Sequence, residues 1–250
     1  MGAPTALMTD GLGVSFGAFK AVDTFSMVVE EGELRVVLGP NGAGKTTLMD
    51  LISGKTQSTS GRVVLFGQDV TNWPEHRIAR AGIGRKFQIP SIFRELTVRQ
   101  NLEVAASEEV GVWRNLRLGL RRREAAKIDD IVELAGLEDV EQRRAGDLSH
   151  GQMQWLELGM LIAQDAKVIL LDEPTAGMTQ AETRKTSEIV NRLKGEHTML
   201  VVEHDMSFVR AIAEKITVMH MGKLLAQGTI EQIENNQAVR DAYLGSGGIH

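Results

Sequence analysis

GPNGAGKTT, at residues 39–47, matches the pattern G-x-x-x-x-G-K-[ST] in full. The apolar run Leu34–Leu38 before it has the character of a buried strand, and we expect a helix from Lys45 to Ser53. Glycines allow backbone N–H groups to curl around phosphate oxygens, and the start of a helix adds the positive end of a dipole. A glycine-rich turn that merely precedes a lysine would not need this strand and helix around it. The stretch therefore predicts a strand–loop–helix unit that binds the phosphates of a nucleotide.

The side chains of this loop predict a division of roles. Lys45 is expected to reach the β- and γ-phosphates, and the hydroxyl of Thr46 is expected to ligate Mg²⁺. The remaining positions surround the phosphates with backbone groups. The predicted nucleotide-binding residues of the loop are Gly39, Pro40, Asn41, Gly42, Ala43, Gly44, Lys45, Thr46 and Thr47.

Outward from the loop, the chain has the strand pattern of an α/β protein. Residues 6–38 alternate short apolar runs with glycine and acidic turns, which indicates antiparallel strands that lead into the buried strand at Leu34–Leu38. Val168–Leu171 and Met199–Val202 are nearly continuous apolar runs, typical of parallel strands that are covered on both faces. Ile216–Met219 and Leu224–Ala226 flank a turn and predict a late hairpin.

From about residue 90 the pattern becomes helical. Thr97 and Gln100 form a plausible capping box, and apolar residues recur at helical spacing from Ile128 to Ala135. We expect one domain over residues 1–250. In it, residues 1–89 and 156–250 form a P-loop α/β core with an N-terminal antiparallel β subdomain, and residues 90–155 form an inserted α-helical subdomain.

Two carboxylates, those of Asp172 and Glu173, directly follow the apolar run Val168–Leu171. Asp172 is placed to hold Mg²⁺, directly or through water, and Glu173 to polarise the water that attacks the γ-phosphate. Because the carboxyl ends of parallel strands line the ligand crevice of α/β folds, both are expected beside the phosphate loop. The alternative is that Asp-Glu-Pro only ends a strand; the phosphate loop upstream favours the catalytic interpretation.

Two more polar residues complete the predicted site. His204 ends the run at 199–202 and is expected to touch the γ-phosphate and orient the attacking water. Gln88, in Arg85–Gln88, is expected to complete the coordination of Mg²⁺ and to sense the nucleotide. A lone histidine at a strand end is more often structural and a glutamine after an aromatic residue is ordinary, so both roles depend on the rest of the set.

Composition limits the class of protein. The 28 basic and 33 acidic residues give a net charge of -5, which argues against nucleic acid as the main partner. The chain has no cysteine, which excludes disulfides and thiolate metal sites. No apolar run approaches the roughly 20 residues that cross a bilayer, and MGAPTALMTDG at the start has no secretory character. We therefore expect a protein that stays inside the cell.

A third segment, LSHGQ at residues 148–152, begins a predicted helix. Ser149 and Gln152 have the spacing of a capping box. Trp155, Leu158 and Ile162 give the helix an apolar stripe. In the simplest interpretation, Ser149 only caps this helix.

In this order, the phosphate loop, Gln88, LSHGQ, the strand end at Asp172 and His204 resemble an ABC-type ATPase nucleotide-binding domain over essentially the whole chain. The resemblance implies ATP and Mg²⁺ as cofactors. It implies that Phe16 stacks on adenine, with Phe19 as a rival. It also implies that LSHGQ binds the γ-phosphate of an ATP held by a partner subunit, so that two copies work as a pair. The signature residues are Ser149, His150, Gly151 and Gln152.

The chain departs from the family pattern at two positions. His150 stands where a glycine is usual, which is tolerable if only the Ser149 hydroxyl and the Gly151 backbone meet phosphate. Thr179 replaces an aspartate that commonly spans the dimer interface. The threonine at position 179 implies that communication between the two ATP sites of the pair is weaker or uses other residues.

Within the family, the chain is most similar to ATP-binding subunits of bacterial importers of the branched-chain amino acid and urea group. GIGRKFQ, LSHGQMQWLELGML and EPTAGMT resemble the urea-type subunit. The resemblance implies a homodimer or a heterodimer with a second ABC ATPase subunit, integral-membrane permease subunits and a periplasmic solute-binding protein. It places the chain at the cytoplasmic face of the inner membrane, with residues 89–96 at the permease and urea as the expected cargo.

Two alternative functions stay open at this point. The cargo is a branched-chain amino acid instead of urea, or the chain is a non-transport ABC ATPase such as an iron–sulfur assembly ATPase. The identity of the partner distinguishes the assembly ATPase from the importer, because an assembly ATPase works with soluble scaffold proteins.

An arginine-rich run lies along the helical part and is either a solvated helix face or a contact with anionic lipid. Its members are Arg114, Arg117, Arg121, Arg122 and Arg123.

Overall fold

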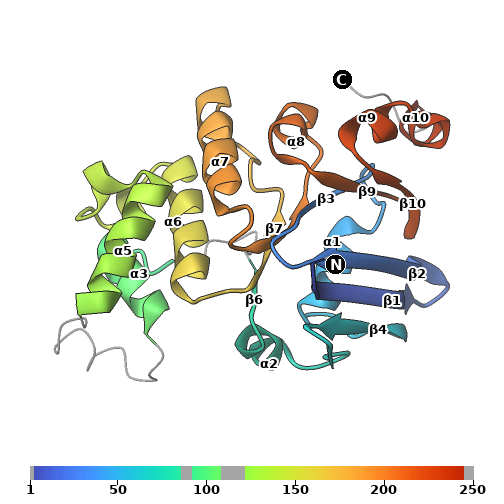
Figure 1. Ribbon diagram of the computed structural model, residues 1–250, viewed down its shortest axis with the longest axis horizontal. Coiled ribbons are helices and arrows are strands. Elements are labelled where there is room, and N and C mark those ends of the chain that lie inside the picture. The colour runs from blue at the N-terminus through green and yellow to red at the C-terminus, as the bar shows by residue number, and fades with distance from the viewer. Residues whose placement is uncertain (1–2, 86–91, 108–121, 245–250) are drawn as a thin grey trace. The chain divides into compact units, whose positions relative to one another are not determined.

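The computed structural model describes residues 3–85, 92–107 and 122–244 of the chain (Figure 1). The contacts within it form two compact units. The core unit comprises Met1–Ile83, Lys167–Pro174 and Leu193–His250, and the helical unit comprises Gly84–Ala166 and Thr175–Arg192.

An antiparallel sheet in the core unit has the strand order β2-β1-β4-β5. The hairpin of β1 and β2 closes by pairing Phe16 with Phe19. Between them Gly17 has a φ of 62°, a left-handed conformation that glycine adopts without a steric cost. The strands are β1 (Thr5–Phe16), β2 (Phe19–Glu30), β4 (Ser60–Leu65) and β5 (Gln68–Asp69). The antiparallel strands predicted ahead of the buried run Leu34–Leu38 are therefore confirmed.

A second, mixed sheet has the order β10-β9-β3-β8-β7-β6. Its central strands β3 (Leu34–Leu38), β7 (Val168–Asp172) and β8 (Thr198–Val202) are buried at every position. β3 pairs in parallel with both β8 and β9, and β7 pairs in parallel with β8. This burial explains the apolar runs, since a strand covered on both faces has no polar side. The outer strands are β6 (Ile83–Arg85), β9 (Lys215–His220) and β10 (Lys223–Gly228), and β9 and β10 form the predicted late hairpin.

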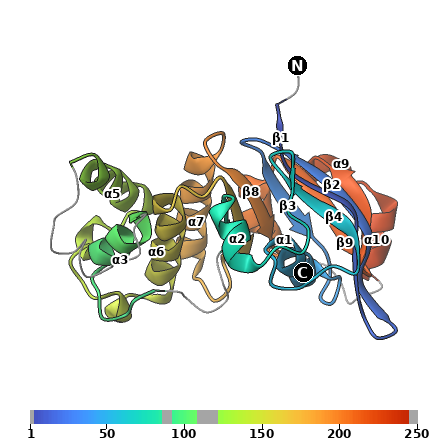
Figure 2. The same ribbon diagram turned by 90° about the horizontal axis from the view of Figure 1, so that it is seen from below.

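Helix α1 (Lys45–Ile52) packs against strands of both sheets, β2 and β7, and this places it in the centre of the core unit (Figure 2). Leu48, Met49 and Ile52 on α1 belong to one apolar cluster with residues of both sheets, among them Phe25. The helix ends one residue before the predicted Ser53, which is its C-cap. The other helices of the unit are α2 (Glu75–Arg80), α8 (Met206–Ile212), α9 (Ile230–Glu234) and α10 (Gln237–Leu244).

The helical unit is organised around α6 (His150–Ala163), which packs against α3 (Val98–Ala106) and α5 (Arg122–Ala135). Both predicted capping boxes form, from Thr97 and Gln100 at the start of α3 and from Ser149 and Gln152 at the start of α6. Single turns of 3₁₀ helix at Glu138–Val140 and Ala145–Asp147 lead into α6. Because α6 is continuous through residue 156, a boundary at that position would divide a helix. The subdomain bounds 1–89, 90–155 and 156–250 stay a prediction.

Trp155 on α6 contacts two residues of α7 (Gln180–Leu193) and so connects the two helices. Its indole Nε1–H donates to Thr186 Oγ1 at 3.0 Å. The Lys185 ammonium lies 4.1 Å from the centre of the Trp155 ring and also donates to the Gly136 carbonyl at 2.8 Å. The sequence predicts Trp155 only as part of an apolar helix stripe. Its contacts with Thr186 and Lys185 give a structural reason for a tryptophan at this position.

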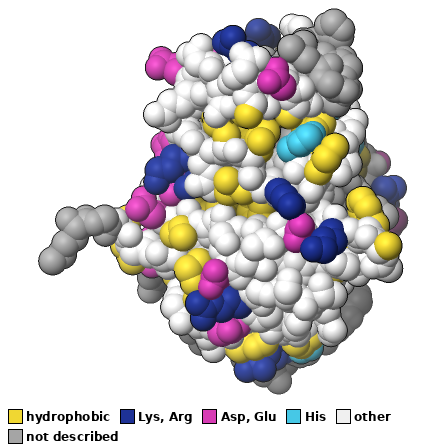
Figure 3. All heavy atoms as spheres, turned by 90° about the vertical axis from the view of Figure 1, so that its right-hand side faces the viewer, with side chains coloured by type: hydrophobic (Ala, Val, Ile, Leu, Met, Phe, Trp, Pro, Cys, Tyr) yellow, Lys and Arg dark blue, Asp and Glu magenta, His cyan; other side chains and the backbone are white. Residues whose placement is uncertain are grey.

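Charged side chains of both signs lie next to one another on the face of the core unit in Figure 3. Lys215 pairs with Glu30 at 3.0 Å, and Asp23 lies 3.3 Å from both Lys20 and Lys223. Among the described residues, no helix is long and apolar enough to cross a membrane. The arginine run falls partly outside the described residues, and the side chains of Arg122 and Arg123 are not described.

Replacing Phe25 by alanine tests the core. Phe25 is fully buried on β2, so Phe25→Ala is expected to lower the free energy of unfolding by about 3–5 kcal/mol, measured by urea denaturation. Val28→Ala is the matched control, because Val28 lies on the same strand and is 46% exposed. It is expected to cost less than about 1 kcal/mol. Equal losses in the two variants would contradict this placement of the core.

Candidate functional site

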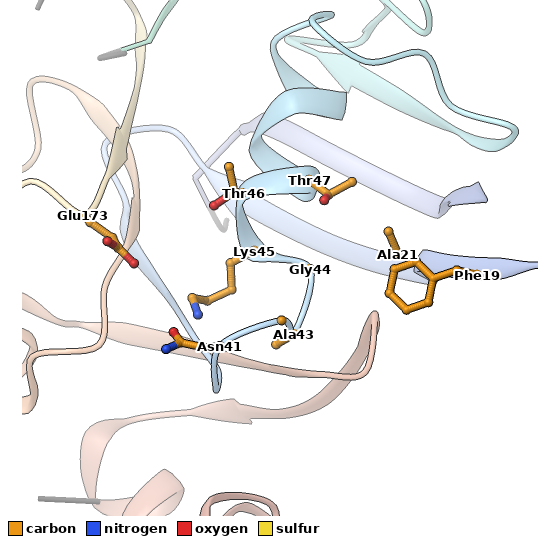
Figure 4. Close-up of a pocket in the computed structure, with 10 residues that line it drawn as sticks. Phe19, Ala21, Asn41, Ala43, Gly44, Lys45, Thr46, Thr47 and Glu173 are labelled. Carbon is orange, nitrogen blue, oxygen red and sulfur yellow. The ribbon is translucent and has the colours of Figure 1, made fainter. Parts of the chain in front are cut away.

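The phosphate loop joins the end of β3 to the start of α1 and forms one wall of a pocket of about 270 Å³ (Figure 4). All residues that line the pocket belong to the core unit. The pocket brings residues 41–47 together with Glu173 from the end of β7, as the sequence predicts. The lining residues are Phe19, Ala21, Asn41, Gly42, Ala43, Gly44, Lys45, Thr46, Thr47 and Glu173.

Two glycines allow the loop to approach its neighbours closely. A Cβ atom on Gly39 would lie 2.3 Å from the carbonyl oxygen of Met219, at the end of β9. Gly44 has a φ of 100°, and a Cβ there would lie 2.3 Å from the carbonyl oxygen of Ala21 on β2. The loop is therefore enclosed by backbone from both sheets, and only glycine fits these two positions.

Lys45 is buried at the start of α1, and its Nζ donates to the carbonyl oxygens of Gly39 at 2.7 Å and Pro40 at 3.1 Å. Burial lowers the pKa of Lys45, and the negative charges of Glu173, Asp172 and Glu203 oppose that effect in part. In Figure 4, Lys45 and Glu173 extend toward each other from opposite sides of the pocket. The arrangement holds one cation where phosphate oxygens would meet the loop.

Glu173 follows β7 in a left-handed backbone conformation, with a φ of 47°. For a residue with a side chain this conformation costs about 1–2 kcal/mol. It is held by a hydrogen bond from the Glu173 N–H to the Val202 carbonyl at 2.9 Å. Strained residues of this kind cluster at active sites, where the surrounding structure fixes the direction of a side chain.

His204 stands beside Glu173, with Nδ1 3.5 Å from Glu173 Oε1. Its side chain is 60% exposed, and that of Glu173 is 37% exposed. A carboxylate next to an imidazole can accept a proton from a water molecule while the ring orients that water. The structure therefore brings together the two residues that the sequence assigns to the attack on phosphate.

The predicted Mg²⁺ ligands have suitable chemistry. The Thr46 hydroxyl lines the pocket, and Asp172 lies buried at the end of β7, close enough to Lys45 for their charges to interact. Hydroxyl and carboxylate oxygens are the ligands that Mg²⁺ prefers, usually one or two of them together with phosphate oxygens and water. Across residues 3–85, 92–107 and 122–244, no group of three or more His, Cys, Asp or Glu could hold a metal ion by itself. The third predicted ligand, Gln88, lies outside the described residues.

Sequence reasoning missed the part played by Glu203. Its Oε2 accepts hydrogen bonds from the backbone N–H groups of His204 at 3.0 Å and Asp205 at 3.4 Å. The carboxylate is buried, and it fixes the chain where β8 ends and α8 begins. A second acidic strand end therefore supports the position of His204, which the apolar–acidic pattern alone did not reveal.

Of the two candidate aromatic residues, the structure places Phe19 along the pocket, together with Ala21. Phe16 is not among the lining residues, although the two rings are similarly exposed, at 57% for Phe16 and 64% for Phe19. They face each other as the closing pair of the hairpin, so the sequence offset alone could not separate them. Phe19 becomes the better candidate for contact with the base, and its role stays a prediction.

The signature residues belong to the helical unit and are not among the residues that line this pocket. Ser149 Oγ accepts from the Gln152 N–H at 3.2 Å, and Gln152 Oε1 accepts from the Ser149 N–H at 3.0 Å. His150 Nε2 lies 3.1 Å from the carbonyl oxygen of Ala176. The start of α6 is thus fixed both by its own cap and by the segment that follows Pro174.

Comparison with known families supports the resemblance. The sequence model of the family described as ABC transporter matches residues 22–176. A second, described as branched-chain amino acid ATP-binding cassette transporter, matches residues 223–249.

Named relatives span nearly the whole chain. The high-affinity branched-chain amino acid transport ATP-binding protein BraF of Pseudomonas aeruginosa is 37% identical over 250 residues, which cover 96% of this chain and 97% of the relative. LivG of Escherichia coli, with the same description, is 36% identical over 248 residues, with coverage of 96% and 97%. The lipopolysaccharide export system ATP-binding protein LptB of Haemophilus influenzae is 32% identical over 240 residues. These comparisons give no support to urea and favour the alternative cargo, a branched-chain amino acid.

Solved structures agree with the fold. An ATP-binding cassette of an ABC transporter in its ADP conformation has a TM-score of 0.84 at 31% identity, covering 96% of this chain and 99% of that one. A nucleotide-free cassette has a TM-score of 0.80 at 30% identity, with coverage of 96% and 98%. A dimeric cassette bound to ADP and phosphate has a TM-score of 0.74 at 22% identity, which shows the fold alone.

The pocket geometry predicts that the two phenylalanines differ in nucleotide binding. Phe19→Ala is expected to weaken ATP binding by roughly 5- to 160-fold, the range for loss of one base–aromatic stack. Phe16→Ala, at a similarly exposed position of the same hairpin, is the control and is expected to leave affinity nearly unchanged. Equilibrium binding of a fluorescent ATP analogue measures both. The opposite order of effects would return the role to Phe16.

Proposed function

Because the chain belongs to the ABC transporter family of ATP-hydrolysing subunits, we propose that it powers a bacterial importer of branched-chain amino acids. The observation that carries this cargo is the match of residues 223–249 to the branched-chain amino acid cassette family. It agrees with the 37% identity to BraF over 96% of the chain. The transported solute does not bind in the nucleotide pocket. The proposed cargo therefore rests on similarity to known transport subunits and not on the chemistry of the site.

The proposed hydrolysis uses residues that the structure brings together. The phosphate loop and Lys45 bind the β- and γ-phosphates. Glu173 accepts a proton from the attacking water, and His204 orients that water against the γ-phosphate. Thr46 and Asp172 would hold Mg²⁺, with Gln88 as the third predicted ligand; when bound, the ion neutralises charge on the phosphate oxygens.

We further propose that the active form is a pair. In it, the Ser149 hydroxyl and the Gly151 N–H at the start of α6 would meet the γ-phosphate bound to a partner subunit, with His150 and Gln152 beside them. The capped start of a 14-residue helix supports this role, because the positive end of the helix dipole there favours an anion. The partner is a second copy or a second ABC ATPase subunit.

As an importer ATPase, the chain would bind integral-membrane permease subunits at the cytoplasmic face of the inner membrane, and a periplasmic solute-binding protein would deliver the cargo to them. Residues 89–96, proposed for the permease contact, begin outside the described part of the chain. Urea is kept as a second cargo on one observation, the similarity of LSHGQMQWLELGML and EPTAGMT to the urea-type subunit.

Replacing Glu173 separates binding from hydrolysis. Glu173→Gln removes the proton acceptor but keeps the size of the side chain. It is expected to retain ATP binding, to lower turnover by about 10²–10⁴-fold, and to accumulate as an ATP-bound dimer. Phosphate release and light scattering after gel filtration measure these effects. Glu31→Gln, an exposed site in the same unit, is the control for the change in charge. Normal turnover in Glu173→Gln would refute Glu173 as the base.

The cargo is tested through the partners. The tagged chain is expected to co-purify from native membranes with a permease and a solute-binding protein. Calorimetry on that binding protein should show binding of leucine, isoleucine or valine and none of urea. Binding of urea alone would overturn the proposed cargo. Recovery of soluble scaffold proteins in place of a permease would overturn the transport function.

A further inference from the structure

One carboxylate, that of Glu182, serves the start of α7. Its Oε2 accepts hydrogen bonds from the Thr179 N–H at 2.9 Å and the Thr179 hydroxyl at 2.8 Å. The Glu182 N–H donates in return to Thr179 Oγ1 at 3.3 Å. This is a capping box, in which Thr179 is the cap and Glu182 the third residue of the helix.

The same carboxylate also lies against the start of α6. The Gly151 N–H lies close enough to this carboxylate to lower its pKa. A Cβ atom on Gly151 would lie 2.5 Å from Glu182 Oε1 and 2.8 Å from its carboxyl carbon, so the close approach of Glu182 requires glycine at this position. Glu182 therefore connects the first turns of two helices, α6 and α7, within the helical unit.

His150 makes a second connection between the same two segments. Besides its contact with the Ala176 carbonyl, its ring lies within 3.5 Å of the position that a Cβ on Gly177 would take. The segment from Ala176 to Thr179 is thus attached to the signature of its own chain at both ends. Thr179, where an aspartate is common in the family, takes part through Glu182 and not through a charge of its own.

The carboxylate is held in its charged form. Hydrogen bonds from the Thr179 N–H and hydroxyl, together with the nearby Gly151 N–H, lower the pKa of Glu182 against the opposing effect of burial. An anion is favoured at this place, because both helices point the positive ends of their dipoles toward it. The Gly151 N–H carries a single hydrogen, so a second anion that takes it competes with Glu182.

From these contacts we propose that Glu182 is a positioning residue of the signature: it holds the Gly151 N–H in the unpaired chain and yields it to the γ-phosphate of the partner's ATP when two chains pair. This inference rests on the paired site proposed above. The negative charge of Glu182 then opposes the arrival of phosphate and raises the concentration of chain at which ATP induces pairing.

The test compares variants in the Glu173→Gln background, where the ATP-bound pair accumulates. Glu182→Gln keeps the capping box, since glutamine is equally suited to it, but removes the charge. It is expected to lower the midpoint concentration of ATP-dependent pairing by roughly two- to fivefold, the range for an anion at a helix start. Analytical ultracentrifugation measures the midpoint, and the melting temperature without nucleotide shows that the fold is kept.

Two controls separate charge from structure. Glu188→Gln makes the same change at an exposed position of α7 and is expected to leave the midpoint unchanged. Glu182→Asp keeps the charge and is expected not to lower the midpoint. A purely structural role for Glu182 would weaken pairing in every variant that disturbs it, in contrast to the tighter pairing expected for glutamine.

An unchanged or raised midpoint in Glu182→Gln would overturn the inference while leaving the paired site intact. The same would follow if Glu188→Gln lowered the midpoint equally, because the effect would then be one of net charge. Absence of ATP-dependent pairing in the Glu173→Gln parent would instead overturn the paired site, and the inference with it.

Discussion

Close packing of the phosphate loop against backbone from both sheets is the constraint on which the core unit depends. The carbonyl of Met219 at the end of β9 and that of Ala21 on β2 leave no room for a Cβ at Gly39 or Gly44. The loop in turn hydrogen-bonds the β9–β10 turn, where the Gly222 N–H donates to the Ala43 carbonyl at 2.9 Å. The shape of the phosphate site is therefore set by the position of the sheets and not by the loop alone.

The same packing explains where the charged residues lie. Lys45 is buried because α1 begins inside this enclosure, and its carbonyl partners are those of the loop itself. Asp172 and Glu173 reach it because β7 ends at the same edge of the sheet as β3, as expected for parallel strands. The left-handed conformation at Glu173 costs strain, which its backbone hydrogen bond to Val202 offsets. Burial of the Glu203 carboxylate costs desolvation, which the hydrogen bond from the His204 N–H offsets.

Helix starts are the second recurrent element of the molecule. Ser149, Thr179 and Asp205 each cap a helix with a side-chain oxygen, and in the first two cases a residue three positions later completes the box. At the start of α6 and α7 a single carboxylate is shared between two of these sites. The capping box of α7 is thereby linked to the signature segment, which is proposed to contact the γ-phosphate of an ATP bound to another chain.

The sequence by itself determined the parts of this protein that depend on neighbouring residues. These are the phosphate loop between a strand and a helix, the buried strands β3, β7 and β8, and the capping boxes at Thr97 and Ser149, because periodicity and capping act over a few residues. Only the tertiary structure decided which of Phe16 and Phe19 lines the pocket, where the Glu203 carboxylate turns, and that Glu182 reaches Gly151. The pocket and the contact of Glu182 with Gly151 depend on segments far apart in the chain, whose separation is fixed by the packing of sheets and helices and leaves no periodic signal in the sequence. The Glu203 carboxylate bonds the backbone of the next two residues, a contact that periodicity does not signal either.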